Sequence, residues 1–166
     1  MIVAENRKDL AAAERDGLGA AMSDRLLLNS DRINAMAVAI EEIAAMDDPV
    51  GRIEKMSVRP SGIRVGQMRI PVGVVAVIYE SRPNVTTDIA ALCIKSGNAA
   101  ILRGGKAAIH SNTELHDVIR RALADAGAPE AAVTFIDGTD RELGPILLKM
   151  NSYIDIVIPR GGEGLI

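Results

Sequence analysis

The chain has 166 residues, of which 48% are hydrophobic and 25% charged, and its formal net charge is −3 at pH 7. The acidic balance and the aromatic content of only 2% argue against binding to nucleic acid, which needs clustered cations and stacking side chains, and no apolar run is long enough to span a membrane. With no signal-peptide layout at the N-terminus, we expect a cytoplasmic protein whose partner is a small molecule.

The part of the sequence before the sheet is expected to contain helices and then a hairpin. Residues 1–56 are expected to be a helical segment: 4–15 is rich in helix formers, and apolar residues recur at helical spacing after Ser30, a candidate N-cap. Residues 57–72 alternate apolar and polar side chains after a Pro-Ser-Gly turn, which predicts a solvent-exposed β-hairpin.

From residue 73 onward, short apolar runs alternate with helical segments. The expected strands are 73–79, 99–102, 132–136 and 153–158. The helices between them have candidate N-caps at Thr86 or Thr87, Ser111 and Thr139. This alternation predicts an α/β fold, a Rossmann-like parallel sheet with helices on both faces, over residues 73–166. Ligands of such sheets bind beyond the carboxyl ends of the strands.

Two of the loops at that edge carry Arg-Gly-Gly. In Arg103-Gly104-Gly105-Lys106, the glycines allow close approach to the backbone and the cations can bind phosphate, but a tight turn with solvated charges fits equally well. Arg160-Gly161-Gly162 precedes an expected helix N-terminus, a natural anion site, although a glycine linker has a similar composition. The sequence contains neither a P-loop nor a full dinucleotide fingerprint.

The loop that follows the first strand of the sheet combines an acid, an arginine and an amide. Its Arg82 can bind a phosphate or a carboxylate, and its Asn84 can donate a hydrogen bond to a developing oxyanion. An ordinary strand-to-helix turn is the alternative explanation of the same residues.

The cysteine and the histidines give no sign of a metal site. Cys93, the single cysteine, lies within an expected helix among apolar residues, which is typical of a buried structural thiol. His110 and His116 are six residues apart, so they do not share a helix face in the way that two ligands would. We therefore predict no bound metal.

Six stretches of the sequence resemble one known family. They are residues 59–74, 78–86, 95–99, 101–105, 153–155 and 158–162. Together they resemble the gamma-glutamyl phosphate reductases, also called glutamate-5-semialdehyde dehydrogenases, of the aldehyde dehydrogenase superfamily. The resemblance covers essentially the whole chain, and the Tyr-Glu-Ser-Arg-Pro-Asn-Val sequence of residues 79–85 is highly specific.

The resemblance implies an enzyme of proline biosynthesis. It would reduce L-glutamyl 5-phosphate to L-glutamate 5-semialdehyde with NADPH and release phosphate. In the superfamily a cysteine attacks the acyl carbon, and hydride then reduces the thioester. The resemblance also implies the superfamily's own variant of the Rossmann sheet, without the glycine fingerprint, and a homo-oligomer in whose contact the hairpin takes part.

The resemblance also assigns roles to individual residues. Cofactor binding would fall to Arg103, Gly104, Gly105, Lys106, Gly161 and Gly162. Lys106 stands where NAD-preferring relatives tend to carry an acid, so it suits the 2′-phosphate of NADP. Asn84 matches the oxyanion-hole asparagine, and Arg82 would bind the substrate.

The family's catalytic cysteine is not among these residues. It lies in a second α/β domain, after the Pro-Arg-Gly-Gly loop, and Cys93 does not align with it. The chain therefore resembles an N-terminal fragment with an incomplete fold, truncated before the catalytic domain, and we expect it to be inactive alone. Two hypotheses stay open, a reductase and an isolated non-catalytic nucleotide-binding module.

Overall fold

The structure is a computed structural model, and it describes residues 1–162. The helices are α1 (Ile2–Arg15), α2 (Ala20–Leu26), α3 (Ser30–Ala45), α4 (Asn84–Lys95), α5 (Ile109–Asp125) and α6 (Leu143–Lys149), with short 3-10 turns at Lys106–Ala108 and Glu130–Ala132. The strands are β1 (Ile53–Val58), β2 (Arg64–Met68), β3 (Val74–Tyr79), β4 (Ala99–Arg103), β5 (Val133–Phe135) and β6 (Ile156–Arg160). None of the helices in the described range is both long and apolar enough to cross a membrane.

The main sheet has four parallel strands in the order β5-β4-β3-β6. The first strand, β3, therefore lies inside the sheet, and its Val75 is paired with Ala100 on one side and Ile156 on the other. The chain builds outward from β3 to β4 and β5, and α6 then returns it to the opposite side of β3. The same strand order, with the switch of direction beside the first strand, is found in Rossmann-type sheets. The predicted α/β fold is therefore confirmed.

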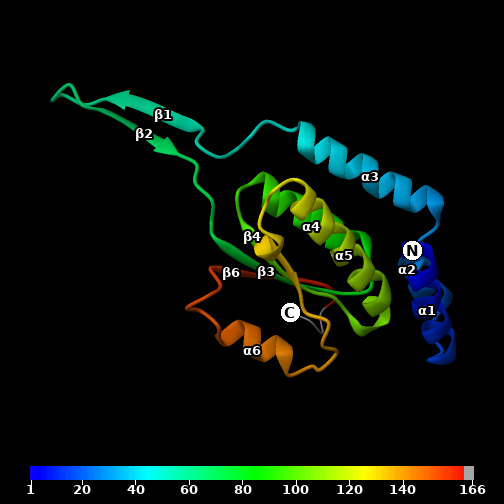
Figure 1. The fold of residues 1–166 in the computed structure, drawn as a ribbon. Helices are drawn as coiled ribbons and strands as arrows, with labels where there is room; N and C mark the ends of the chain where they lie inside the picture. The colour runs from blue at the N-terminus through cyan, green and yellow to red at the C-terminus, as the bar shows by residue number, and fades with distance from the viewer. Residues whose placement is uncertain (163–166) are drawn as a thin grey trace.

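The two faces of β3 are both covered by helices. Val77 and Tyr79 point into a core with residues of α4 and α5, whereas Ala76 and Ile78 point to the other face, where they meet Leu147 of α6. Figure 1 shows α4 and α5 above the sheet and α6 below it. Burial on both faces explains why β3 is a continuous apolar run instead of an alternating one.

Helix α1 is joined to the sheet domain by a buried carboxylate. Asp9, only 2% exposed, accepts hydrogen bonds from the backbone N–H groups of His110 (3.1 Å) and Ser111 (2.8 Å) and from the Ser111 hydroxyl (2.5 Å). These N–H groups belong to the first turn of α5, where no carbonyl of the helix itself can accept their hydrogen bonds. Asp9 is therefore the N-terminal cap of a helix that begins a hundred residues later.

A buried amide holds the connection between α2 and α3. The Asn6 Nδ2 donates to the Leu26 carbonyl (2.7 Å) and to the Ser111 hydroxyl (3.0 Å), and its Oδ1 accepts from the Leu28 backbone N–H (2.8 Å). Buried polar groups need hydrogen-bond partners, and both the amide nitrogen and the amide oxygen of Asn6 have them. The segment 26–28 is thus fixed to both α1 and α5.

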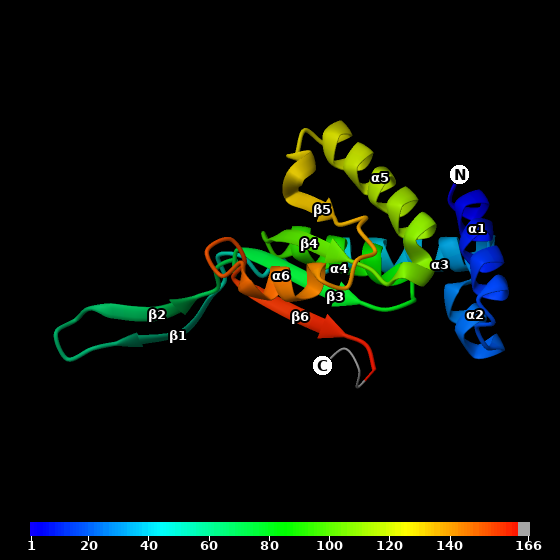
Figure 2. The ribbon, with the colours of Figure 1, turned by 90° about the horizontal axis from the view of Figure 1, so that it is seen from below.

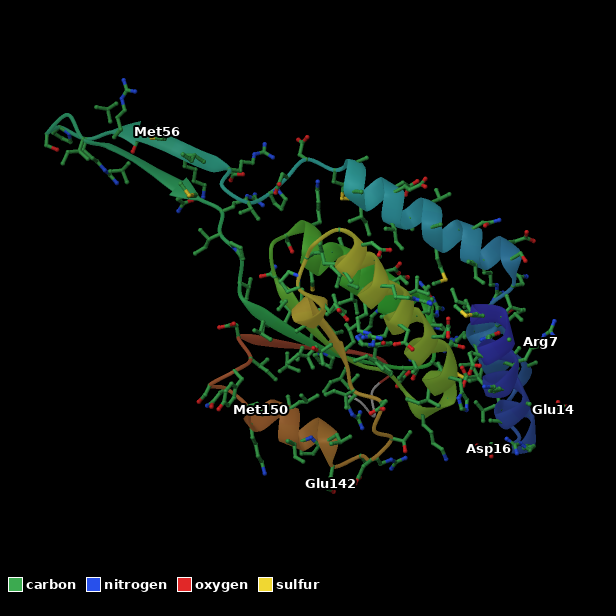
Figure 3. All side chains as sticks on the ribbon, in the orientation of Figure 1. Arg7, Glu14, Asp16, Met56, Glu142 and Met150 are labelled. Carbon is green, nitrogen blue, oxygen red and sulfur yellow. The ribbon has the colours of Figure 1, made fainter. Side chains whose placement is uncertain are left out.

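The antiparallel hairpin of β1 and β2 extends away from the sheet, at the end opposite α1 and α2 (Figure 2). Every residue of its two strands is exposed except Glu54, which is partly buried. Figure 3 shows Met56 on this arm, far from the other labelled side chains. The expected exposed hairpin is present, but β1 begins at Ile53, inside the segment 1–56 that was expected to be helical.

A β-bulge explains why the start of β1 was not predicted. Lys55 has a positive φ of 53°, and the pairing register shifts between Glu54 and Ser57. Such a bulge puts an extra residue into one strand and breaks the period-2 alternation on which the prediction depended. The short helix α2 was not predicted, since its seven residues hold less than two helical repeats.

The N-caps predicted for three helices, α3, α4 and α5, are wrong, because each of these helices begins at least one residue before the position that its predicted cap requires. Helix α4 begins at Asn84 and α5 at Ile109, so that Thr86, Thr87 and Ser111 lie buried inside the first turns. The N-cap of α3 is Asn29, not Ser30: its Oδ1 accepts from the Arg32 N–H at 2.9 Å.

The predicted cap Thr139 is also wrong. Helix α6 begins at Leu143, and the carboxylate of Asp140 accepts from the Glu142 N–H at 3.0 Å. The aspartate therefore supplies the local side-chain-to-backbone bond that the capping box assigned to the threonine.

A second carboxylate secures the amino end of the sheet. Asp155 Oδ2 accepts from the Val74 N–H at 2.7 Å, 81 residues away in the sequence. A Cβ on Gly73, whose φ is +125°, would collide with that carboxylate. Glycine is therefore required where β3 begins beside the segment that leads into β6.

Candidate nucleotide and substrate site

The carboxyl ends of β3, β4 and β6 lie at one edge of the sheet, on the side where α1 and α2 pack (Figure 2). The chain leaves β3 toward β4, while β6 returns on its other side, so this edge contains the topological switch point where open α/β sheets bind their ligands. Three cavities open around it. We name them the α6-side, switch-point and α3-side cavities.

The α6-side cavity has a volume of about 560 Å³. It is lined by all four residues of the first Arg-Gly-Gly loop, together with residues of and before α6: Arg103, Gly104, Gly105, Lys106, Thr139, Arg141 and Gly144. The structure thus brings the first predicted cofactor loop to one hollow and adds Arg141, which the sequence analysis missed. Arg103, Lys106 and Arg141 line this hollow together with one acid, Glu80. The excess of cations suits a phosphate-bearing ligand.

The residues of this loop differ in how they are held. Arg103 Nη2 donates to the Asp140 carbonyl at 2.6 Å, while its buried Nε has no partner among residues 1–162. A Cβ on Gly104 would collide with the Asn112 side chain, whereas one on Gly105 would make only ordinary contacts, the nearest at 3.5 Å. Gly104 is therefore needed for packing, whereas Lys106 is exposed to solvent.

The switch-point cavity has a volume of about 340 Å³. Its lining residues come from α2, from the ends of β3 and β6 with the loops that follow them, and from the start of α4: Met22, Arg25, Tyr79, Glu80, Ser81, Arg82, Val85, Arg160, Gly161 and Gly162. The Gly162 N–H donates to Glu80 Oε1 at 3.1 Å. The Glu80 carboxylate thus accepts the hydrogen bond of the Gly162 N–H, which an anionic ligand would otherwise accept. An incoming phosphate must therefore displace Glu80 or bind beside it.

The α3-side cavity, of about 420 Å³, contains Asn84. Asn84 is the first residue of α4, and its Nδ2 donates to Asp88 Oδ2 at 2.9 Å, one turn further along the helix. Burial raises the pKa of Asp88, and the bond from Asn84 and the charge of Arg160 partly oppose this rise. An amide nitrogen has two hydrogens, so within residues 1–162 Asn84 keeps one donor for a ligand.

The cavities group the predicted residues in two sets. Arg82 lines both the switch-point and the α3-side cavities, so it connects the second glycine loop with Asn84. Asn84 and the Arg103 loop line different cavities. Arg25 and Asp88 were not predicted from the sequence. The i,i+4 spacing of Asp88 from Asn84 was a usable signal, but no local pattern indicated Arg25.

Cys93 lies in the core between α4 and the sheet, where it packs in one cluster with Val75 and Leu123. Burial raises the pKa of its thiol, which disfavours the nucleophilic thiolate. Among residues 1–162, no three His, Cys, Asp or Glu side chains come together as they would around a metal ion.

Comparisons with known proteins agree with this architecture. No protein-family model matches the chain. The gamma-glutamyl phosphate reductase of Desulfatibacillum aliphaticivorans is 58% identical over 162 residues, which is 98% of this chain and 39% of that protein. The crystal structure of gamma-glutamyl phosphate reductase from Thermotoga maritima superposes with a TM-score of 0.95 at 43% identity, over 99% of this chain and 40% of that one.

A more distant structure shares the fold alone. An acetylating aldehyde dehydrogenase from Geobacillus thermoglucosidasius matches with a TM-score of 0.66 at 22% identity, over 99% of this chain and 37% of that one. The chain spans about 40% of the length of the gamma-glutamyl phosphate reductases that it matches. The resemblance inferred from the loop sequences is confirmed: along nearly its whole length, the chain is similar in sequence and in fold to gamma-glutamyl phosphate reductases.

Proposed function

We propose that this chain carries the nucleotide-binding part of a gamma-glutamyl phosphate reductase. The reaction would be the reduction of L-glutamyl 5-phosphate to L-glutamate 5-semialdehyde with NADPH and release of phosphate, a cytoplasmic step of proline biosynthesis. The observation that carries the proposal is 58% identity over 98% of the chain to a curated reductase. The alternative is a non-catalytic nucleotide-binding module.

The residues of the α6-side cavity fit the adenosine end of NADP. Lys106 and Arg141 border a hollow of about 560 Å³, and the buried Arg103 Nε has no partner among the described residues. Lys106 and Arg141 would bind the 2′-phosphate, and Gly161 and the neighbouring N–H groups would lie near the pyrophosphate. When bound, NADPH supplies the hydride for the reduction.

The residues of the chain itself would bind and orient the acyl phosphate. Arg82 would attract an anionic group of the substrate, and the free N–H of Asn84 would stabilise negative charge on the acyl oxygen. Asp88 would act as a positioning residue, because it accepts the other N–H of Asn84 at 2.9 Å. Cys93 is a residue of α4 that is buried in the core against the sheet, and this burial supports the proposal that the chain alone is inactive.

Cofactor titration tests the proposed nucleotide site. The chain should bind NADPH about 10–100-fold more tightly than NADH, the value of one charge-assisted contact with the 2′-phosphate. Lys106→Ala should remove most of that preference and leave NADH affinity unchanged. Lys55→Ala, on the distant hairpin, is the matched control. Equal affinities for the two cofactors would contradict the assignment of this loop.

An assay of the reaction tests the role of the thiol. NADPH oxidation with L-glutamyl phosphate should stay at background for the 166-residue chain and for Cys93→Ser alike. Turnover by the parent chain that the serine variant lacks would show that Cys93 is a nucleophile. It would thereby overturn the inactive-chain proposal.

A further inference from the structure

Two arginines from distant parts of the sequence face the same hollows. Arg25 lies in the last turn of α2 and Arg82 in the loop between β3 and α4, yet both line the switch-point cavity and the α3-side cavity. They therefore stand on the boundary between the second glycine loop and Asn84. Among residues 1–162, they alone line both of these cavities.

Neither guanidinium is neutralised within the described chain. Among residues 1–162, no carboxylate oxygen lies within 4.0 Å of the side chain of Arg25 or of Arg82. Like charges that border one hollow repel each other, and an anion between them turns the repulsion into attraction. The pair therefore has the charge of an anion site that is not filled by the protein itself.

The neighbouring Arg32 is used differently. Its guanidinium bonds to the Asp24 carboxylate at 2.6 Å, to the Asp24 carbonyl and to the Leu27 carbonyl at 3.1 Å. Arg32 is thus a structural residue that holds the residues on both sides of Arg25. Together with Asn6, which binds the backbone of Leu26 and Leu28, it fixes the backbone that presents Arg25 to the cavities.

The acidic and amide groups around the pair extend its chemistry. Asp24 and Asp88 line the α3-side cavity beside Asn84, and Glu80 lines the switch-point cavity. Two arginines line both cavities, and three carboxylates line one cavity or the other. Such a surface suits a ligand that has an ammonium group and more than one anionic group.

We propose that Arg25 and Arg82 act together as the anion-binding pair of the substrate site, so that helix α2 is part of that site. The ligand class is an α-amino acid with a second anionic group, a phosphate or a carboxylate, at the end of its side chain. This inference rests on the proposed function and adds to it a residue, Arg25, and a segment outside the sheet domain.

Titration followed by NMR of the 15N-labelled chain tests the pair without turnover. The probe is L-2-amino-5-phosphonopentanoate, a stable amino acid with a terminal phosphonate. Arg25→Ala and Arg82→Ala should each weaken its binding about 10–100-fold, the value of one charge-assisted hydrogen bond. Arg25→Lys should restore part of the affinity. Arg7→Ala, at an exposed position of α1 (Figure 3), is the matched control and should change nothing.

Two shorter probes show which anion the pair binds. Pentylphosphonate lacks the amino-acid head, and L-norvaline lacks the phosphonate. If Arg25→Ala weakens only pentylphosphonate, the pair binds the terminal anion; if it weakens only norvaline, the pair binds the α-carboxylate. Both results support the proposal.

Three results would overturn it. They are no binding of any probe by the parent chain, unchanged affinity in Arg25→Ala, and a loss confined to NADPH. Failure of the proposed reaction is a separate result: arginine-dependent binding of the amino-acid probe by a protein without reductase activity would remove the reaction and keep the pair.

Discussion

Helices α1 and α2 and the hairpin β1–β2 both lie outside the main sheet, at opposite ends of it (Figure 2). The helices are joined to the sheet domain through buried polar groups: Asn6 is 1% exposed and Asp9 is 2% exposed. The hairpin has the reverse character, because apolar side chains such as Met56 and Met68 are 57% and 58% exposed.

The difference shows two ways in which a segment outside a core can be used. The buried hydrogen bonds of α1 fix it to α5, and through Asn6 they also hold the end of α2, which presents Arg25 to the cavities. The hairpin contributes little to the core, so its exposed apolar residues suit contact with another copy of the chain. We propose that the protein is a homo-oligomer on this basis, and the following variants separate the two kinds of segment.

The largest effect is expected at the attachment of α1. Asp9→Ala leaves the N–H groups of His110 and Ser111 without their acceptor in a buried place, and loss of a charged hydrogen-bond partner and cap costs about 2–4 kcal/mol. Urea unfolding should show this decrease in the free energy of unfolding. Asp16→Ala, at the exposed end of the same helix (Figure 3), is the control and should change stability by less than about 0.5 kcal/mol. Equal effects of the two variants would show that the buried carboxylate does not attach α1.

A smaller effect, on association and not on folding, is expected in the hairpin. Met68 lies opposite Ile53 in the register of the two strands, and Met68→Lys should weaken self-association about 10–100-fold, as for one central interface residue. Sedimentation velocity over a concentration series measures this change. The free energy of unfolding should stay within about 0.5 kcal/mol.

The control for the hairpin is a second exposed apolar residue. Val38 on α3 is 52% exposed, and Val38→Lys should leave association unchanged. A parent chain that stays monomeric at high concentration, or an equal loss in both variants, would contradict the role of the hairpin.

The smallest effect on stability is expected at Asp88, a residue of α4 that lines the α3-side cavity. Burial raises the pKa of this carboxyl, so the folded protein binds the proton more tightly than the unfolded chain does. The cost to stability is therefore present above the folded pKa and disappears as the pH falls below the ordinary value of about 4.

Asp88→Asn should accordingly stabilise the protein at pH 7 and no longer at about pH 2.5, well below the ordinary pKa of an aspartate. The gain should not exceed about 1 kcal/mol, because solvent screens a half-exposed charge, and the new amide oxygen can still accept from Asn84. Thermal unfolding at the two pH values measures it. A gain that is the same at both values would show that the ionised carboxylate is not the cause.

Much of this architecture could be predicted from the sequence, because its main signals are local. The continuous apolar run of β3 and the alternation of strands and helices predicted the parallel sheet, and the Arg103 loop was placed at the correct edge. The N-caps could not be predicted in the same way. Serine is a common N-cap residue, but the backbone N–H of Ser111 donates to Asp9, 102 residues away. No local sequence pattern predicts that contact.

The candidate site shows the same division. Arg82, Asn84 and the glycine loops follow strands, so the fold class alone gives them a position. Arg25 belongs to a short helix with no periodic pattern, and it reaches the cavities only because Asn6 and Arg32 hold the chain around it. Residues placed by long-range hydrogen bonds therefore need the structure to be found.

The bond between Val74 and Asp155 has a consequence for synthesis on the ribosome. The two residues are separated by 81 positions, and at 5–20 residues per second the second is made about 4–16 s after the first. Throughout that interval β3 exposes an unpaired edge of Val and Ile, a surface prone to aggregation. The nascent chain should therefore depend on chaperones that cover this strand until β6 emerges.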